Sequence, residues 1–539
     1  MKNLNYKIGI LAALILVFAG CGKDYLNINV DPNNPSDVPN GQLLTGSQIN
    51  VINALGVGSA GLGRSASVMV HQTMNRSNDD GYAITGNDFT INTSWQTLYA
   101  GGLQDIEVII RAGTLRGEFQ YVGVAKLLKA YTYGSMVDVW GNIPFTEATL
   151  GEKNPFPKFD DGSAVYASLF LLIDEAIGDL AKPAPVTNVV PGTDDLIYGG
   201  DLVKWRKFGK ALKLKLYNNQ RLTGNVSAQV AALVADPDLT SGISDFELRY
   251  VNVAAPENRN PAFQNDYNPA YINRITTYIS RYFYEILANK STLNTVLSGI
   301  ADPRIPYYFV NQLGSANPTA QNPVEYKDGN FLTINFSSQS PNQGFDQGKS
   351  LTATGLYYCG GKFDNATGGA VGLASGTGTA PQRLYTNYNF LYNKAELAQV
   401  GLTTEDPRVL LKQAMDASFA KVNSIAANAS VTQISTASIT AYTTAVLVKY
   451  DAASAAGKLE LIMTEKWIAN FGNSLESYAD YRRTGFPVMF DPATDGDPNT
   501  NLNRTYPLSF PWRQNDLNVN PNAPQQKLVA TDRVFWDVN

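Results

Sequence analysis

The chain has 539 residues, of which 44% are hydrophobic and 17% are charged, an ordinary balance for a folded globular protein. It carries 42 basic and 47 acidic residues, a net charge of −5, which argues against a nucleic-acid-binding surface because such a surface needs a basic face. One histidine and two cysteines exclude a multi-histidine metal site and a disulfide framework. Tyrosine (29) and phenylalanine (23) are abundant. The composition favours a binding protein over an enzyme, and we expect no cofactor.

The first residues predict a secretory signal peptide over 1–20. Met1–Lys7 is basic, and Ile8–Phe18 is apolar but too short to span a bilayer. Small residues then precede Cys21, so that Phe18–Cys21 resembles the lipobox of bacterial lipoproteins. This resemblance implies that Cys21 is lipidated and that residues 21–40 form a tether; an ordinary signal peptide with an incidental Cys21 is the alternative.

Residues 41–240 form a helical region. Apolar residues recur there at a spacing of three to four, which predicts helices over Gln42–Leu55, Ser94–Thr114, Phe119–Trp140, Val165–Leu180, Asp201–Arg221 and Val226–Asp236. Such a succession predicts antiparallel helix pairs stacked as a solenoid. The lysines of Asp201–Arg221, including Lys215, are expected on a solvated face.

The amino-acid composition changes over residues 241–401, where Gly, Asn, Thr, Ser and Tyr dominate. We expect a loop-rich insertion with short strands on the ligand side, containing one longer helix at Ile272–Asn289. In residues 402–539 we again expect helices, at Pro407–Ala427, Thr436–Ala455 and Leu459–Phe471. The last residues should form an irregular tail that packs back over the core. The fold class expected is mainly α, a helical solenoid with a large insertion.

Four local features carry little functional weight. Gly56–Gly61 matches GxGxxG but follows a helix, so we interpret it as an interhelix loop. His71 has no nucleophile elbow to serve and is interpreted as a structural histidine, and Cys359 as a small buried thiol. Asp495, Asp497 and Asn499 alternate oxygen donors as calcium loops do, but Tyr506 stands where the bidentate Glu would be, so a solvated turn is favoured over a calcium site.

The positive chemical signal is the combination of aromatic rings with amides and charged groups. Sugar rings stack their C–H faces on aromatic side chains while their hydroxyls need polar partners. The candidate ligand-binding residues are Arg76, Asn78, Asp80, Tyr82, Asn87, Phe89, Tyr271, Tyr278, Tyr307, Tyr357 and Tyr358. The alternative is that these tyrosines are packed in the core with their hydroxyls hydrogen-bonded.

Several segments together resemble the SusD/RagB family of Bacteroidetes nutrient-binding lipoproteins. Lys23-Asp24 resembles the surface-export signal of such lipoproteins. The other matching segments are Asp31–Pro35, Trp95–Tyr99 with Gly102-Leu103, Ala125–Tyr131, Val137–Phe145, Ala211–Tyr217, Glu465–Trp467 and Asp480–Pro487. These segments are scaffold: we expect Trp95 and Trp140 to pack helices together, and Arg482 and Arg483 to pair with acids or cap helix ends. No family ligand residue is carried over, because residues 240–400 do not match.

The resemblance implies a right-handed body of tetratricopeptide-like units and no catalytic activity. It implies a lipid-anchored protein of the outer membrane, facing the cell surface, that acts as a lid on a TonB-dependent transporter of the SusC type. The ligand it implies is an oligosaccharide or, as in some relatives, an oligopeptide. A surface-anchored glycoside hydrolase and a purely protein-binding helical scaffold are the alternatives from other classes.

Overall fold

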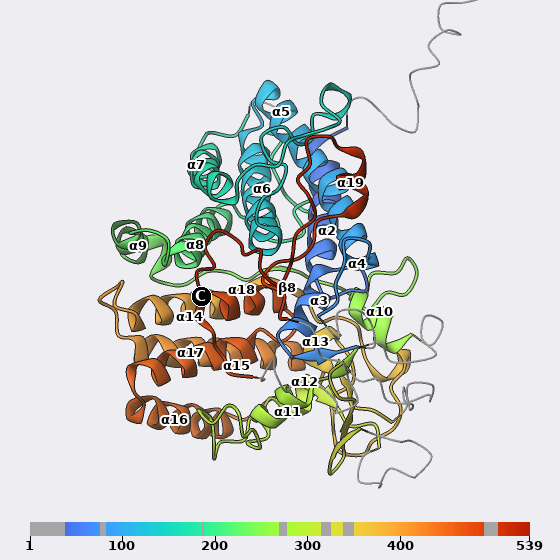
Figure 1. The fold of residues 1–539 in the computed structure, drawn as a ribbon, viewed down its shortest axis with the longest axis vertical. Helices are drawn as coiled ribbons and strands as arrows, with labels where there is room; N and C mark the ends of the chain where they lie inside the picture. Colours follow the sequence, from blue (N-terminus) through green and yellow to red (C-terminus); the bar gives the residue numbers. More distant parts are fainter. Residues whose placement is uncertain are drawn as a thin grey trace, which may run out of the picture.

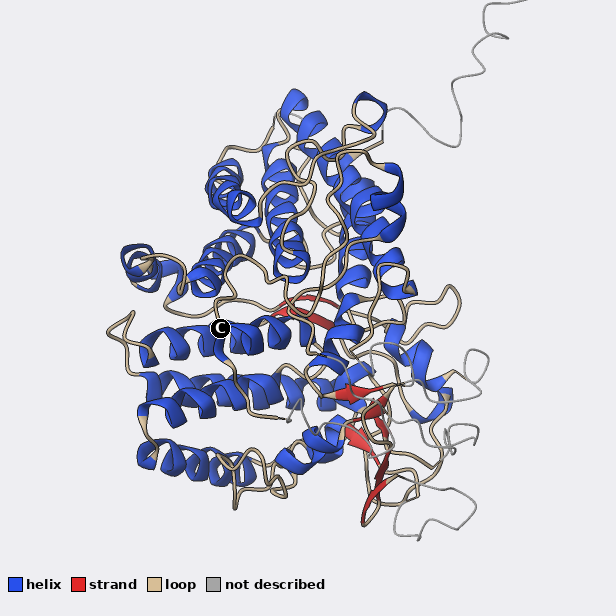
Figure 2. Cartoon of the chain, viewed as in Figure 1, coloured by secondary structure: helices blue, strands red, loops and turns tan. Residues whose placement is uncertain are grey.

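The computed structural model describes residues 38–75, 82–185, 188–268, 277–313, 325–337, 350–489 and 505–539. Helices dominate, and they form two groups that run in different directions (Figures 1 and 2). In the N-terminal helical group, α2 to α9, helices α2 and α6 stand upright, and the C-terminal helical group, α14 to α18, lies crosswise below it. Most of the short strands gather at one side of the lower group, and the others lie between the two groups. The predicted mainly helical architecture is confirmed.

The N-terminal helical group forms where the apolar periodicity predicts helices. Its members are α2 (Asn40–Leu55), α3 (Leu62–Met69), α4 (Phe89–Gln96), η3 (Thr97–Leu103), α5 (Gln104–Arg116), α6 (Phe119–Trp140), α7 (Gly162–Leu180), α8 (Leu202–Gln220) and α9 (Ser227–Val234), with 3₁₀ turns at η4 (Gly151–Lys153) and η5 (Pro237–Leu239). Helix α6 packs between α5 and α7. Asp161 and Asp201 cap α7 and α8 by accepting backbone N–H bonds.

The single helix predicted over Ser94–Thr114 is three consecutive segments, α4, η3 and α5. The middle one, η3, is a π-helix. Its Gly101 and Gly102 lie against α2: a Cβ on Gly101 would stand 2.8 Å from Asn50 Nδ2, and one on Gly102 2.9 Å from Val51 Cγ2. Close packing on α2 therefore favours glycine at 102, while a Cβ at 101 would displace the Asn50 amide, which donates to the Gly101 carbonyl.

The loop-rich middle region contains short strands and short helices, as predicted. Strands β1 (Thr73–Met74), β3 (Tyr278–Ile279), β7 (Ala353–Thr354) and β4 (Phe309–Val310) form one antiparallel sheet in that order; β2 (Phe246–Leu248) pairs with β8 (Gln382–Tyr385), and β5 (Tyr326–Asp328) with β6 (Phe331–Thr333). The helices are α10 (Pro261–Tyr267), α11 (Arg281–Leu287), α12 (Ile305–Tyr308), α13 (Leu356–Cys359) and the 3₁₀ turn η7 (Leu373–Ser375). The helix expected over Ile272–Asn289 is wrong in its described part, because Tyr278–Ile279 pairs as a strand and Ser280 caps a shorter helix.

The C-terminal helical group is larger than predicted. It consists of α14 (Asn387–Gln399), α15 (Pro407–Asn428), α16 (Thr436–Ala452), α17 (Ala455–Ala469) and α18 (Ser474–Thr484), followed by α19 (Gln514–Val519) in the tail. Helix α14 falls within residues 241–401, where a loop-rich insertion was expected, yet it packs against α15 and α17 of this group. It is buried on nearly every side, including its polar residues Asn389, Asn393 and Glu396, so burial does not follow the hydrophobic periodicity by which a helix is predicted.

A buried set of charged side chains joins the two helical groups. We call it the interlayer charge network; its members are Asp138, Lys215, Arg221, Glu396, Lys466, Glu476, Asp480 and Arg483. Lys215 Nζ of α8 lies 3.1 Å from both Asp138 Oδ2 of α6 and Glu476 Oε1 of α18. Lys215 is 3% exposed, so its expected place on a solvated face is wrong.

The rest of the network lies among α8, α14, α17 and α18. Glu396 accepts from Arg221 at 2.9 Å and also pairs with Arg483. Asp480 accepts from Lys466 at 2.8 Å. Arg483 thus pairs with acids, as predicted, whereas Arg482 donates to backbone carbonyl groups, including that of Leu508 at 2.8 Å. Each charge is met by an opposite charge, which is the condition for keeping it buried.

The tail packs back over the end of α6, as predicted. Trp140 Nε1 donates to the Pro511 carbonyl at 3.0 Å, and Phe510 N donates to the Val139 carbonyl at 2.9 Å. Trp536 Nε1 reaches Asp138 Oδ1 at 2.9 Å, so the tail also contacts the interlayer charge network. Trp95 and Trp140 meet edge to face with centroids 4.9 Å apart, which confirms their packing role. In the described part of the chain, no helix is both long and apolar enough to cross a membrane.

Replacing Lys215 by Met should destabilise the protein by about 3–5 kcal/mol, because Asp138 and Glu476 would keep buried negative charge without their shared partner. Thermal and denaturant unfolding would measure the change. Lys412→Met is the matched control, since Lys412 pairs with Asp416 on the exposed surface of α15 and the variant should unfold like the parent. Equal stability of the two variants would contradict a structural role for the network.

Candidate functional site

Eight residues singled out in the sequence lie outside the described residues. They are Cys21, Arg76, Asn78, Asp80, Tyr271, Asp495, Asp497 and Asn499. Their roles in lipidation, ligand binding and calcium binding stay predictions. Among the residues that the structure does describe, no group of three or more His, Cys, Asp or Glu side chains is placed to hold a metal ion.

Most of the remaining candidates are core residues. Tyr82, Tyr278, Tyr307, Tyr357 and Tyr358 are at most 4% exposed. Tyr82 hydrogen-bonds His71 Nε2 at 2.7 Å, and Tyr357 donates to the Ala469 carbonyl at 3.2 Å. These rings lack the exposed faces that ligand stacking would need. His71 and Cys359 are fully buried, in agreement with their structural interpretation.

Only Asn87 and Phe89 of the described candidates are exposed, Phe89 by 66%. They lie at the start of α4, outside the pocket between α2 and the chain after β2. None of the described candidates lines that pocket. The residues that do line it come from other segments.

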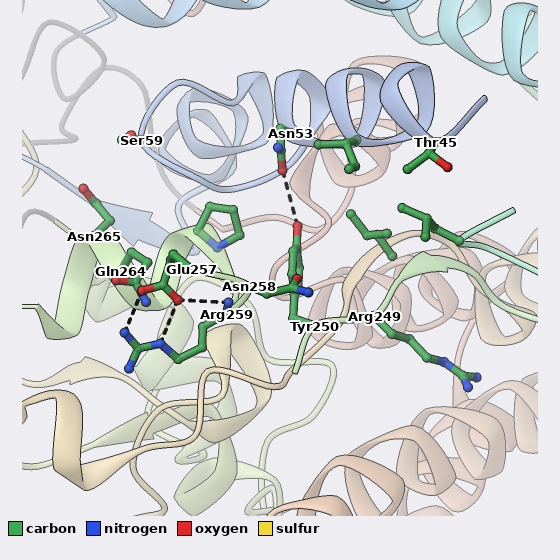
Figure 3. A pocket seen from close by; sticks show the side chains of 14 residues that line it. Thr45, Asn53, Ser59, Arg249, Tyr250, Glu257, Asn258, Arg259, Gln264 and Asn265 are labelled. Carbon is green, nitrogen blue, oxygen red and sulfur yellow. Dashed lines mark hydrogen bonds and ion pairs between the residues drawn. The ribbon is translucent and has the colours of Figure 1, made fainter. Parts of the chain in front are cut away.

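A pocket of about 700 Å³ opens between α2 and the chain that follows β2. We call it pocket A; its lining residues are Thr45, Ile49, Asn53, Ser59, Leu196, Leu248, Arg249, Tyr250, Glu257, Asn258, Arg259, Pro261, Gln264 and Asn265. In Figure 3 Tyr250 points from the lower wall up to Asn53 on α2, with Arg249 to one side and Arg259, Gln264 and Asn265 to the other. The volume suits a ligand of several rings.

The lower wall of pocket A is held by backbone hydrogen bonds. Val251 N donates to the Asn258 carbonyl at 3.0 Å, and Asn258 N donates to the Val253 carbonyl at 2.9 Å. Asn260 then caps α10 through its side chain, and its Nδ2 donates to the Ala380 carbonyl at 2.8 Å. This wall is therefore preformed, which limits the entropy lost when a ligand binds.

The upper wall depends on the glycines after α2. Gly56–Gly61 connects α2 to α3 as an interhelix loop, as predicted. A Cβ on Gly61 would stand 2.1 Å from the Gly56 carbonyl oxygen, and one on Gly58 would stand 3.0 Å from Pro261 Cβ. Glycine here serves the close approach of backbone segments, including α10 of the opposite wall.

The polar groups of pocket A surround one aromatic ring. Tyr250 donates to Asn53 Oδ1 at 3.4 Å, and burial raises the pKa of its phenol, so the hydroxyl stays protonated. Gln264 Nε2 lies in the wall and has no hydrogen-bond partner in the described chain. Arg249 is 80% exposed at the mouth. A ring beside an amide donor that has no partner can stack a sugar and bind one of its hydroxyls.

Pocket A has no acid–base pair. Its single carboxylate, Glu257, forms a bidentate pair with Arg259 at 2.7 and 2.8 Å. This hydrogen bonding by Arg259 lowers the pKa of Glu257, so the group is ionised and already neutralised. Glycoside hydrolysis ordinarily uses two carboxyl groups across the scissile bond. The geometry therefore supports binding and not hydrolysis.

Sequence reasoning missed the residues of pocket A. Asn53 is 197 positions from Tyr250, and only the packing of α2 on the segment after β2 brings them together. The run Glu257–Pro261, with its charged and amide side chains before a helix, is the local signal that could have drawn attention to the lower wall.

Comparison with known proteins agrees with this binding geometry. The profile of a family described as "Starch-binding associating with outer membrane", SusD-like, matches residues 32–511. A solved chitin-binding protein is 19% identical with a TM-score of 0.67, covering 93% of this chain and 100% of its own. A chitin-binding SusD homologue from Flavobacterium johnsoniae is 17% identical with a TM-score of 0.65, covering 92% of this chain and 99% of its own.

A SusD homologue from Bacteroides fragilis is 18% identical with a TM-score of 0.65, over 90% of this chain and 94% of its own. At these identities the structural matches establish a shared fold. No curated protein sequence matches the chain. The expected helical architecture and the sequence resemblance are both confirmed.

Asp266 on α10, next to the wall of pocket A, should make stability depend on pH. Burial raises its pKa to about 6. The unfolded chain releases this proton near pH 3.8 and the folded chain only near 6, so the free energy of unfolding should fall as pH rises between them, by up to about 1.4 kcal/mol per pH unit from this group.

Asp266→Asn removes the titration and keeps an acceptor for the hydroxyl of Thr354, which lies 2.9 Å from Asp266 Oδ2. Denaturant unfolding between pH 4 and 7 should therefore show a flatter decline in stability for the variant. The same slope in variant and parent would exclude Asp266 as the titrating group.

Proposed function

Because the chain belongs to the SusD-like family, whose members are non-catalytic binding proteins, we propose that it captures an oligosaccharide in pocket A at the outer membrane. The observation that carries this proposal is Tyr250, an aromatic ring placed between the amide side chains of Asn53 and Asn258 in a pocket of about 700 Å³. An aromatic face with amides around it matches the two faces of a sugar, apolar C–H groups and hydroxyls.

A glycan fits pocket A better than a peptide does. The wall of the pocket contains a donor, Gln264 Nε2, and an amide side chain, Asn258, that have no hydrogen-bond partner among the described residues, whereas its charged residues are paired or at the rim. Hydroxyl and acetamido groups use such neutral donors and acceptors. Chitin oligosaccharides are the first ligands to test, because two solved structures of the same fold are described as chitin-binding. An oligopeptide is the second candidate.

We also propose that the protein delivers its ligand to a transporter. The chain would be held at the cell surface by lipid on Cys21 and would pass its ligand, as a lid, to a TonB-dependent transporter of the SusC type. Three acyl chains on one cysteine would anchor the protein stably, where a single chain gives marginal binding. For a ligand to drive closure of the lid, it must bind the closed state more tightly than the open one.

Tyr250→Ala should weaken binding of the preferred oligosaccharide by roughly 5- to 100-fold, since stacking and its hydrogen bond to Asn53 are lost together. Calorimetric titration with chitin, starch-type and peptide oligomers, followed by a check that each ligand is intact, measures this. Asn53→Ala should weaken binding too, while Asn428→Ala, at the exposed end of α15, is the matched control and should leave it unchanged. Equal affinity of Tyr250→Ala and parent would move the site away from pocket A.

Cys21→Ala should abolish lipidation and leave an unprocessed or soluble protein, because the thiol is the group that receives the lipid. Fractionation and surface labelling of cells that express the variant would show the change. The Cys359→Ala variant is the control, since Cys359 is buried and should not affect anchoring. Surface display of Cys21→Ala at the parental level would refute the anchor.

A further inference from the structure

Pocket A adjoins a second pocket at one of its ends. We call this pocket B; it has a volume of about 830 Å³ and is lined by the chain from Thr193 to Gly199, the chain before β2, the starts of α8 and α14 and one face of α15. Leu196 and Arg249 line both pockets, so the two share a boundary. Figure 3 shows Arg249 at the opposite end of pocket A from Arg259. Pocket B therefore extends pocket A beyond Arg249, and its walls come from both helical groups.

The walls of pocket B are held by hydrogen bonds and ion pairs. In the loop before α8, Asp195 accepts from the indole N–H of Trp205 at 2.7 Å. At the start of α14, Asn387 N donates to Asp245 Oδ1 at 2.8 Å, and Lys421 of α15 pairs with the same carboxylate. Walls that are fixed before binding limit the entropy lost when a ligand binds.

The surface of pocket B is mostly polar, and several of its groups are free. The hydroxyl groups of Thr193, Ser244 and Ser424 have no hydrogen-bond partner among the described residues. The two tyrosines of the lining, Tyr198 and Tyr388, are at most 8% exposed, so neither offers a ring face to a ligand. Pocket B can thus bind the hydroxyls of a sugar but cannot stack its ring.

Arg249 supplies donors at the boundary between the two pockets. Its side chain is 80% exposed, and its Nε lies 3.4 Å from Glu247 Oε1. Its terminal groups, Nη1 and Nη2, have no partner in the described part of the chain. Their N–H groups can therefore donate to the oxygens of a ligand that crosses from one pocket to the other.

We propose that pockets A and B form one groove for a long oligosaccharide. One part of the chain would stack on Tyr250 in pocket A, and the next sugars would pass Arg249 and lie along α15 in pocket B. The groove depends on the proposed function, because pocket B has no exposed ring to hold a sugar by itself. Contacts in pocket B form within a complex that pocket A has already made, so they add to affinity without a second loss of translational freedom. Affinity should therefore rise with the length of the glycan.

The test compares a chitin disaccharide, which pocket A can hold alone, with a chitin hexasaccharide by calorimetric titration. Ala420 and Ser424 are exposed, lie four positions apart on α15 and line pocket B. The double variant Ala420→Leu/Ser424→Leu keeps good helix-forming residues there and fills this part of the groove with side chains that cannot hydrogen-bond. It should bind the hexasaccharide roughly 5- to 20-fold more weakly than the parent does, and the disaccharide equally well.

The matched control is Ala437→Leu/Ala441→Leu, which introduces two leucines at the same spacing on exposed positions of α16, outside both pockets. It should bind both oligomers as the parent does. Tyr250→Ala should weaken the binding of both oligomers, because its ring holds the sugar from which the longer chain extends.

Parental hexasaccharide affinity in Ala420→Leu/Ser424→Leu would overturn the groove and leave pocket A as the site. Equal affinity of the parent for the two oligomers would do the same. So would binding of two hexasaccharides per protein, since the two pockets would then hold separate ligands. Failure of the parent to bind either oligomer would contradict the proposed function itself, and the groove with it.

Discussion

The buried charges between the two helical groups determine how the rest of the structure is arranged. Asp138 of α6 accepts hydrogen bonds from Lys215 of α8 and from Trp536 of the tail, so three distant parts of the chain meet at one carboxylate. Glu396 and Asp480 form ion pairs that likewise connect α14 and α18 to the end of α8 and to α17. Charges in such a place are tolerated only when every partner is present. The two helical groups are therefore held in one relative orientation, and α2, the upper wall of pocket A, is part of the upper group.

Pocket A places one aromatic ring among polar groups. Tyr250 stands beside the amide of Asn53 and near a paired carboxylate, and the wall that carries it is fixed by backbone hydrogen bonds. This arrangement combines an apolar ring face with polar groups, as a sugar does with its C–H face and its hydroxyls.

The absence of an acid–base pair in pocket A has a physical basis in Arg259. Its guanidinium binds Glu257 through two hydrogen bonds and lowers the pKa of that carboxyl group, so the group is ionised and carries no proton to donate. A pocket of this kind can hold a ligand but has no group to cleave it. This agrees with membership of a family of binding proteins.

The sequence by itself determined the helical class, most helices of the N-terminal group, the interhelix loop at Gly56–Gly61 and the family, because periodicity and local motifs depend on neighbouring residues. Tertiary structure decided what depends on contacts between distant segments. Lys215 looks like a solvated lysine until α6 and α18 supply its partners, and α14 buries polar residues such as Asn389 and Glu396 that sequence reasoning would leave exposed. Tyr357 and Tyr358 look like binding rings but are core residues, while Tyr250 becomes a candidate only beside Asn53, 197 positions away. Whether an aromatic ring faces a ligand or the core is set by packing, which composition does not reveal.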